Sequence, residues 1–289
     1  MNNIAIVPTI RNDTEIEYLA VIIAKLKKNG AAVYMDAKYS SLSACGDIVF
    51  LNEEDVYKDC ELIIVLGGDG SILRAAEYAL KYDVPLLGVN LGRLGYMAGL
   101  EKNELDLIEN IFLRNYTIEE RMTLSVDVAK QDGNVIHIGD ALNDVVVGRG
   151  GYSHTIDINL VANGKQVRTI RADAVIFATP TGSTAYSMSA GGSVIDPALK
   201  CICVTPVCPV SRYACPLVFT EDTILEVSHG DDRSGNFSII LDGDGHNSLD
   251  MGETLVIKRS EKAVKMLSVK SEGFFEKLNS KISKYELKS

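Results

Sequence analysis

The sequence predicts an α/β N-terminal domain with a mostly parallel, Rossmann-like sheet, then a β-rich, β-sandwich-like domain and a C-terminal helix. Short apolar runs alternate with helical stretches over the first hundred residues, which is typical of β-α-β units. From about Tyr116 the pattern becomes period-two alternation, and after Ser271 it becomes a helical stripe. We therefore expect domains at 1–115 and 116–269, with the helix at 270–289.

The N-terminal domain is predicted to begin with a strand and a helix. Four apolar runs are candidate parallel strands: 4–7, 32–35, 62–66 and 86–89. After the first strand, Thr14 and Glu17 stand at capping-box spacing, and Asn29-Gly30 is a stop signal. The expected buried face of this helix consists of Ile16, Leu19, Ile23 and Leu26. A second helix is expected directly after Gly70, through Ile72, Leu73, Ala76 and Leu80.

The second domain is predicted to be built from antiparallel strands. Apolar residues alternate with polar ones at Leu124, Val126 and Val128, and again at Ile156, Ile158 and Leu160. Asp132-Gly133 and Asn163-Gly164 are hairpin turns, because both central residues tolerate positive φ. After this domain, the helical stripe must be buried, and packing on the first domain would bury it. The stripe consists of Phe274, Phe275, Leu278, Ile282 and Tyr285.

Composition and charge exclude several classes of protein. The chain has 289 residues, with 29 Lys and Arg against 39 Asp and Glu, so its formal net charge is −10. This balance disfavours a nucleic-acid binder, which normally shows a basic face. The longest apolar runs are too short to cross a membrane, and the start has no secretory signal pattern. We therefore expect a cytoplasmic protein that holds any phosphorylated ligand by backbone N–H groups, a few Arg or a metal.

Four of the six cysteines form a cluster with the pattern Cys-x-Cys-x4-Cys-x6-Cys, from Cys201 to Cys215. Structural zinc usually needs two Cys-x2-4-Cys knuckles, which are missing here. Cys201 and Cys203 alternate along an apolar run, so we interpret them as small core residues and expect no metal site on the protein.

The strongest local signal is the turn Gly67-Gly68-Asp69-Gly70 between a buried strand and a helix. Its glycines allow a tight turn, and N–H groups at the helix start attract phosphate. Asp69 would lie at the carboxyl edge of the sheet, where it could accept a proton or help to hold Mg²⁺. The alternative is a glycine-rich turn in which Asp69 only caps the helix.

Two later segments also break their local pattern. Asn143 and Asp144 interrupt an apolar strand, where they could bind hydroxyl groups or mark a bulge or an edge. Arg171 and Asp173 stand at the entrance of a strand that leads into the polar segment TPTGSTAYS. In that segment Tyr186 could stack on a base, or the segment could be an ordinary polar loop.

Taken together, these segments resemble the NAD kinase family, in particular its bacterial, ATP- or polyphosphate-dependent members. The matches run in family order: GGDG at 67–70, GVNLGRLGYMAGL at 88–100, LNDVVV at 142–147, TPTGSTAYSMSAGGSVIDP at 179–197, VTPVCPVSRYACPLV at 204–218 and LDGDG at 241–245. The resemblance implies the fold predicted above, with the C-terminal helix returning to the first domain. It also implies phosphoryl transfer from ATP or polyphosphate to the 2′-hydroxyl of the adenosine ribose of NAD, giving NADP.

The resemblance assigns roles to residues of this chain. Asp69 would be the catalytic base or hydroxyl-orienting carboxylate, and a divalent metal, Mg²⁺, would be carried with the phosphates of ATP. The other implied binding residues are Gly70, Arg74 and Tyr96 near the turn, Asn143 and Asp144 for ribose and base edges, Arg171 and Asp173 for the rest of the dinucleotide, Thr184, Ala185, Tyr186 and Ser189 around the adenosine, and His154, Cys208 and Asp244 in the remaining matched segments. His154 could instead be an ordinary strand-surface histidine.

The chain departs from the family pattern at a few positions. Asp144 replaces the usual Glu, and Tyr96 stands where Phe is common. Val210 and Cys215 replace residues that are often basic or small, which weakens inference about their loop. None of these changes touches the GGDG turn.

Two other functions remain open at this stage. A lipid kinase of the same superfamily would need a basic membrane-facing surface, which the acidic balance disfavours. A non-catalytic NAD(P) sensor would not need Asp69 beside an anionic ligand. The resemblance also implies a homodimer or homotetramer with sites near subunit boundaries.

Overall fold

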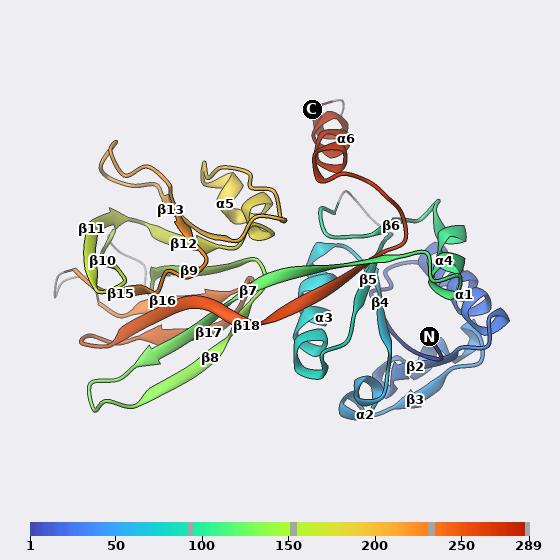
Figure 1. Cartoon of the computed structure of the whole chain (residues 1–289). Helices are drawn as coiled ribbons and strands as arrows, with labels where there is room; N and C mark the ends of the chain where they lie inside the picture. Colours follow the sequence, from blue (N-terminus) through green and yellow to red (C-terminus); the bar gives the residue numbers. More distant parts are fainter. Residues whose placement is uncertain (92–94, 151–154, 231–234, 287–289) are drawn as a thin grey trace. The chain divides into compact units, whose positions relative to one another are not determined.

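The computed structural model describes residues 1–91, 95–150, 155–230 and 235–286, with the side chains of these residues except 246 and 281–286 (Figure 1). The chain forms two compact units, Met1–Glu120 with Val264–Ser289, and Arg121–Ala263. It passes from one to the other along two long strands, β7 (Thr117–Ala129) and β18 (Thr254–Ser268). The prediction of an α/β part, a β-rich part and a C-terminal helix is confirmed.

The first unit contains a parallel sheet with the strand order β18-β5-β4-β1-β2-β3, and β6 pairs with β5. Its own strands are β1 (Asn3–Pro8), β2 (Ala32–Asp36), β3 (Val49–Leu51), β4 (Leu62–Gly67), β5 (Leu86–Asn90) and β6 (Leu100–Glu101). Its helical segments are α1 (Asp13–Lys28), η1 (Ala37–Cys45), α2 (Glu53–Lys58), α3 (Asp69–Tyr82), η2 (Leu105–Ile108), α4 (Glu109–Phe112) and α6 (Phe274–Glu286). The four predicted strands are β1, β2, β4 and β5. The elements η1, β3 and α2 were not predicted: β3 and α2 are too brief to show a period, and η1 has no buried residues and so no apolar pattern.

Helices cover both faces of this sheet. Leu19, Ile22, Ile23 and Leu26 of α1 pack against one face. On the other face α3 approaches β5 so closely that a Cβ added at Gly88 would lie 2.4 Å from Ile72. The predicted capping box of α1 is wrong by two residues: Asn12 is the N-cap and accepts the N–H of Glu15, whose carboxylate accepts the N–H of Arg11. Ile22, rather than the half-buried Ile16, completes the buried stripe.

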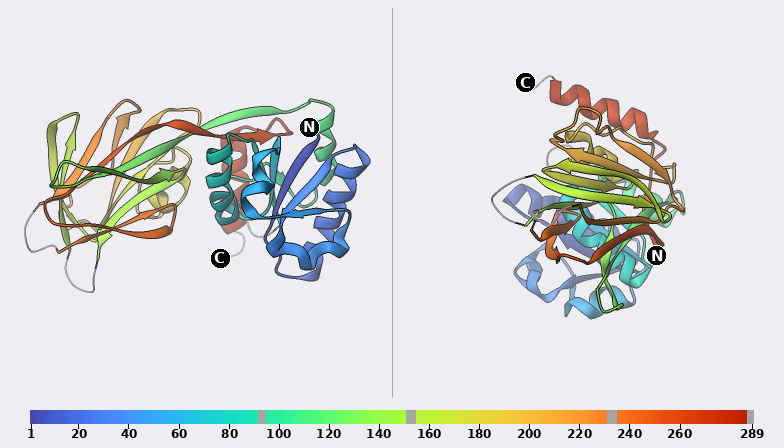
Figure 2. Two further views of the ribbon diagram at one scale, coloured as in Figure 1. Left: turned by 90° about the horizontal axis from the view of Figure 1, so that it is seen from below. Right: turned by 90° about the vertical axis from the view of Figure 1, so that its left-hand side faces the viewer.

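The second unit is a sandwich of antiparallel sheets that share one core (Figure 2). One sheet has the order β11-β10-β15-β18, with β7 paired to β18 and β8 paired to β7; the other has the order β14-β13-β12-β9-β16-β17. The remaining bounds are β8 (Val135–Ala141), β9 (Asp144–Arg149), β10 (Ile156–Ala162), β11 (Lys165–Ala172), β12 (Ala174–Ala178), β13 (Cys201–Val207), β14 (Leu217–Thr220), β15 (Leu225–His229), β16 (Phe237–Leu241) and β17 (Asp244–Leu249). Both predicted hairpins are present: Asn163 and Gly164 both have positive φ, whereas in the first hairpin only Gly133 does, because its loop spans residues 130–134.

One corner of this sandwich differs from the prediction. Residues 139–149 do not form a single strand with a bulge, because the chain bends at Leu142 and Asn143. The preceding strand β8 belongs to one sheet, and the following strand β9 belongs to the other. Asn143 and Asp144 therefore stand where the chain changes sheets, and we call residues 142–144 the corner.

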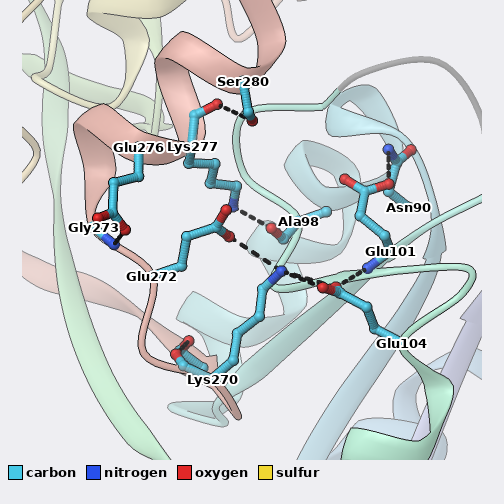
Figure 3. Close-up of polar contacts among 11 residues, drawn as sticks. Asn90, Ala98, Glu101, Glu104, Lys270, Glu272, Gly273, Glu276, Lys277 and Ser280 are labelled. Atoms are coloured by element: carbon cyan, nitrogen blue, oxygen red, sulfur yellow. Dashed lines mark hydrogen bonds and ion pairs between the residues drawn. The ribbon is translucent and has the colours of Figure 1, made fainter.

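The C-terminal helix α6 contacts the first unit through polar groups (Figure 3). The ammonium group of Lys277 donates to the carbonyl oxygen of Ala98. Just before α6, Lys270 forms an ion pair of 2.8 Å with Glu104. Of the predicted apolar stripe, Leu278 is buried and Phe275 is 54% exposed, whereas the side chains of Ile282 and Tyr285 lie outside the described residues.

Candidate functional site

The strand–turn–helix around Asp69 leaves the start of α3 open. All six residues of β4 are buried, and Gly68 is the N-cap of α3 with no side chain to satisfy the first N–H groups. A Cβ added at Gly68 or Gly70 would meet no described atom within 4 Å. An uncapped helix start with open space beside it is suited to bind phosphate oxygens.

Asp69 is the first residue of this helix, and its carboxylate holds the following loop. It accepts the backbone N–H groups of Tyr96 at 2.6 Å and Met97 at 3.1 Å. A Cβ added at Gly95 would lie 2.5 Å from Asp69 Oδ1, so the loop can pass this closely only because residue 95 is glycine. The interpretation of Asp69 as a mere helix cap is therefore wrong, because Gly68 is the N-cap.

A hydrogen bond between two hydroxyl groups stabilises the turn. Thr9, directly after β1, and Ser71, in the first turn of α3, have their hydroxyl oxygens 2.8 Å apart. Gly67 packs against both, since a Cβ there would lie 2.4 Å from Ser71 Oγ. Sequence reasoning missed Thr9 and Ser71, which carry no motif of their own. Arg74 is exposed one helical turn after Gly70.

In the second unit, the corner is fixed by Asp242, which was not among the predicted residues. Its Oδ2 accepts the N–H of Leu142 at 2.7 Å. Its Oδ1 accepts the N–H of Asn143 at 2.7 Å and that of Asp144 at 3.0 Å. One carboxylate thus satisfies three consecutive backbone donors.

Thr179 and Gly182 join the same corner to the segment TPTGSTAYS. The Thr179 hydroxyl donates to the carbonyl oxygen of Leu142 at 2.6 Å, and its backbone N–H donates to that of Asn143 at 2.9 Å. A Cβ added at Gly182 would lie 2.0 Å from the Asn143 carbonyl oxygen, so glycine is required there. The two segments singled out in the sequence are therefore in direct contact.

The segment after Thr179 is not an irregular loop. It forms a short 3-10 turn, η3 (Gly182–Thr184), and a single helical turn, α5 (Tyr186–Ser189). Thr184 is buried and donates its hydroxyl to the Thr181 carbonyl oxygen, while Ala185 lies between the two turns. Tyr186 is 44% exposed and Ser189 is also exposed, so both can contact a ligand.

The electrostatics of the corner are unusual because two carboxyl groups share it. Burial, and then the charge of Asp242, raise the pKa of Asp144 to about 7. Burial also raises the pKa of Asp242, against the three N–H groups that stabilise its anion. Among the described residues, the buried Oδ1 of Asn143 has no hydrogen-bond partner. An unpaired buried acceptor is costly, and such sites are frequent where a ligand completes the bonding.

The other predicted residues of this unit lie elsewhere. Arg171, Asp173 and Cys208 are at the opposite end of β12 from Thr179. At about 3.3 Å per residue, Asp173 and Thr179 are about 20 Å apart. Arg171 forms a two-pronged ion pair with Asp157, and Asp173 lies 3.9 Å from Arg149.

Cys208 is exposed with φ of +48°, at the start of the loop after β13. Asp244 begins β17, is exposed, and accepts the N–H of Gly245. The aspartate that reaches the corner is Asp242, two residues earlier. His154 lies outside the described residues.

Among the residues that the structure describes, no three or more His, Cys, Asp or Glu side chains lie close enough together to bind a metal ion. Cys201 and Cys203 are buried in β13 and pack with Ile176 as small core residues. Asp69 offers one carboxylate at an open helix start, which fits a Mg²⁺ ion that is bound mainly by nucleotide phosphates. A search of the described helices found no segment long and apolar enough to cross a membrane.

Comparison with known proteins gives a consistent answer. The ATP-NAD kinase N-terminal domain matches residues 22–114, and the ATP-NAD kinase C-terminal domain matches residues 142–269. An NAD kinase of Thermoanaerobacter sp. (strain X514) is 33% identical over 284 residues, which are 98% of this chain and 99% of that protein. An NAD kinase of Lachnoclostridium phytofermentans is also 33% identical, over 97% of this chain and 99% of its own length.

Solved structures agree in fold. The chain is similar to yeast NADH kinase complexed with NADH, with a TM-score of 0.88, 24% identity, and coverage of 98% of this chain and 88% of that one. It is also similar to an NAD kinase from Archaeoglobus fulgidus in complex with ATP, with a TM-score of 0.73, 26% identity, and coverage of 97% and 98%. Because both family domains and full-length relatives match, this chain belongs to the ATP-NAD kinase family.

Proposed function

We propose that the chain phosphorylates the 2′-hydroxyl of the adenosine ribose of NAD. The hydroxyl oxygen forms a bond to the γ-phosphorus of ATP, the bond to the β,γ-bridging oxygen breaks, and the products are NADP, ADP and a proton. The observation that carries this proposal is the carboxylate of Asp69 at the open start of α3, oriented by the N–H groups of Tyr96 and Met97. Such a carboxylate can orient the acceptor hydroxyl and take its proton.

Phosphate groups are the natural ligands of the helix start beside Asp69. The uncapped N–H groups near Gly68 and Gly70 carry the positive end of the helix dipole, and Arg74 adds a cation one turn later. These are the local devices that an acidic chain needs. A divalent metal bound with ATP supplies further charge neutralisation for phosphoryl transfer, and Asp69 is the residue that would contact it.

Nucleoside recognition is assigned to the corner and to α5. Asn143 and Asp144 offer an amide and a carboxyl group to ribose and base edges, and Tyr186 offers an exposed ring for stacking. Thr184, Ala185 and Ser189 frame the same place. Asp144 is one methylene shorter than the usual Glu, so the ligand must approach the corner more closely.

We also propose a cytoplasmic homodimer or homotetramer. Arg171, Asp173 and Cys208 lie at the far end of β12 from the corner, about 20 Å away by strand length. A second copy of the chain could bring these three residues to the corner of the first copy. Such an assembly would explain why they lie far from the corner of their own chain. His154 and Asp244 remain proposed ligand contacts.

The reaction is tested by measuring NADP with an NADP-specific dehydrogenase after incubation with NAD, ATP and Mg²⁺. The native chain is expected to form NADP. Asp69→Asn is expected to lower kcat about 10²- to 10⁴-fold, because the amide cannot accept the proton, while NAD binding measured by calorimetry is kept. Asp83→Asn, at the C-cap of the same helix α3, is the matched control and is expected to keep native kcat.

The other outcomes are equally informative. Native kcat in Asp69→Asn would remove Asp69 from the chemistry. Binding of NAD by the native chain without NADP formation, from ATP and then from polyphosphate, would favour the non-catalytic sensor instead.

A further inference from the structure

The hairpin turn between β16 and β17 is built so that Asp242 reaches across to the corner. Asp242 has φ of +51° and Gly243 has φ of +80°, which is the geometry of a tight two-residue turn. The backbone N–H of Asp242 donates to the carbonyl oxygen of Asp144 at 2.9 Å, while its carboxylate receives the three N–H groups of the corner. The turn and the corner are therefore bonded in both directions.

We infer that Asp242 is a positioning residue for nucleoside binding: its carboxylate holds the corner in the one backbone geometry that presents Asn143 and Asp144 to the ligand. This inference rests on the proposed function, because it assumes that Asn143 and Asp144 contact NAD. It adds a residue that the sequence comparison did not single out for any role.

The physical need for Asp242 follows from the change of sheet. Backbone N–H groups within a strand are satisfied by the neighbouring strand, but a chain that leaves one sheet for another loses those partners. At the corner the three donors of Leu142, Asn143 and Asp144 point to one place, and a carboxylate is the side chain that can accept all of them. Hydrogen bonds to a charged acceptor are about twice as strong as neutral ones.

An asparagine at position 242 could replace this carboxylate only in part. Oδ1 accepts two of the N–H groups and Oδ2 accepts the third, that of Leu142. The amide group of Asn would turn its NH₂ toward one of these donors and lose that bond. Asp242→Asn is therefore expected to keep part of the contact with the corner, whereas Asp242→Ala is expected to keep none.

Asp242 also influences the charge of Asp144. Among the described residues, it is the ionisable group whose charge acts on the Asp144 carboxyl, and it opposes ionisation there. Removing Asp242 is expected to move the titration of Asp144 to lower pH. A residue that only stabilised the fold would not shift the pH profile of NAD binding.

The experiment compares kinetics of Asp242→Asn and Asp242→Ala with the native enzyme. We expect KM for NAD to rise about 10- to 100-fold, more in Asp242→Ala than in Asp242→Asn, with KM for ATP unchanged. The acid limb of kcat/KM for NAD is expected to shift to lower pH. Asp132→Asn is the matched control, because Asp132 also accepts a backbone N–H in a hairpin turn of this unit, at the opposite end of β8 from the corner.

Hydrogen exchange of the peptide that contains residues 142–144, followed by mass spectrometry, gives a readout independent of turnover. Its amides are expected to exchange faster in both Asp242 variants and at the native rate in Asp132→Asn. Native KM for NAD in Asp242→Ala, or unchanged exchange at the corner, would overturn the inference. Asn143→Ala separates the two hypotheses: if it leaves KM for NAD unchanged, the proposed nucleoside contact fails, whereas the exchange result still tests the bond from Asp242.

Discussion

At the scale of single residues, the most consequential feature is a carboxyl group buried beside another one. Burial and the charge of Asp242 raise the pKa of Asp144 to about 7, from an unfolded value of about 3.8. The folded chain therefore binds an extra proton between these two pH values. Stability from this proton is fully present below the unfolded pKa and is lost as pH rises through the folded pKa.

Asp144→Asn is expected to reveal this loss, since Asn resembles the protonated acid. The free energy of unfolding of the variant minus that of the native chain is expected to be about 2 to 3 kcal/mol larger at pH 8 than at pH 5. The variant is thus relatively more stable at pH 8, because each pKa unit corresponds to about 1.4 kcal/mol. Urea unfolding at both pH values measures the difference. In the control Asp132→Asn no change between pH 5 and pH 8 is expected, because hydrogen bonds from Asn134 lower the pKa of Asp132 and its carboxyl group is ionised at both pH values. A difference that does not change with pH would contradict the raised pKa of Asp144.

Sequence patterns located the corner but not the residue that holds it. Asn143 and Asp144 were visible because they interrupt an apolar run. The motif LDGDG contains two aspartates, and local sequence does not tell which of them reaches another segment. That choice depends on the pairing of β16 with β9, which places Leu241 opposite Val145 and Asp242 next to the corner.

At the scale of elements, period and length decided which predictions succeeded. The strands β1, β2, β4 and β5 are buried apolar runs and were predicted, whereas the three-residue strand β3 was not. The segment TPTGSTAYS at 179–187 was expected to be a polar loop because it is rich in Gly, Ser and Thr. It forms η3 and α5 because its hydroxyl groups satisfy backbone carbonyls, as Ser183 does with Pro180 at 2.6 Å.

The C-terminal helix was predicted from an apolar stripe, but its described contacts are largely polar. Lys277 of α6 binds the carbonyl oxygen of Ala98, one residue after the Met97 N–H that Asp69 holds. The loop at 95–98 is thus bonded to α3 by its N–H groups and to α6 by its carbonyl group. A cavity of about 260 Å³ lies between residues 98–104 and residues 270–280, and it is lined in part by Glu101, Lys270 and Lys277 (Figure 3).

Replacing Lys277 by methionine tests this second attachment. Lys277→Met keeps the aliphatic stem and removes the donor, so Tm is expected to fall by about 2 to 8 °C. Amide exchange is expected to become faster at residues 274–280, and kcat is expected to fall because the loop that orients Asp69 is held less firmly. Lys102→Met, an exposed lysine on the next stretch of chain, is the control. Native exchange at 274–280 in Lys277→Met would show that α6 is held by other contacts.

At the scale of the whole molecule, two periodicities were enough to predict an α/β unit and a β-rich unit. They did not predict that β7 and β18 run through both, or that β8 and β9 belong to different sheets. Such facts depend on pairings between residues far apart in sequence, which a local period does not encode. The domain boundaries at 115/116 and 269/270 that the sequence predicts stay a prediction.

The proposed oligomer follows from the distribution of candidate residues within the second unit. Asn143 is at one end of the β9–β12 pair and Asp173 is at the other, because Asp144 is opposite Ala178 and Gly148 is opposite Ala174. Suppose that one copy supplies Asn143 and another supplies Asp173 to the same site. An oligomer made of one variant alone then has a defect in every site and is inactive. Mixing the two altered chains can then restore a complete site.

Co-expression of Asn143→Ala and Asp173→Ala chains with different tags tests this complementation. In the mixed dimer one site would carry both changes and the other neither, so about half of the native activity is expected, from symmetry. Each pure variant is expected to be far less active, and light scattering would give the mass of each species. If the mixed oligomer is no more active than the pure variants, Asp173 does not complete the site of a neighbouring copy. If light scattering gives a monomer, the far end of β12 must serve a purpose other than assembly.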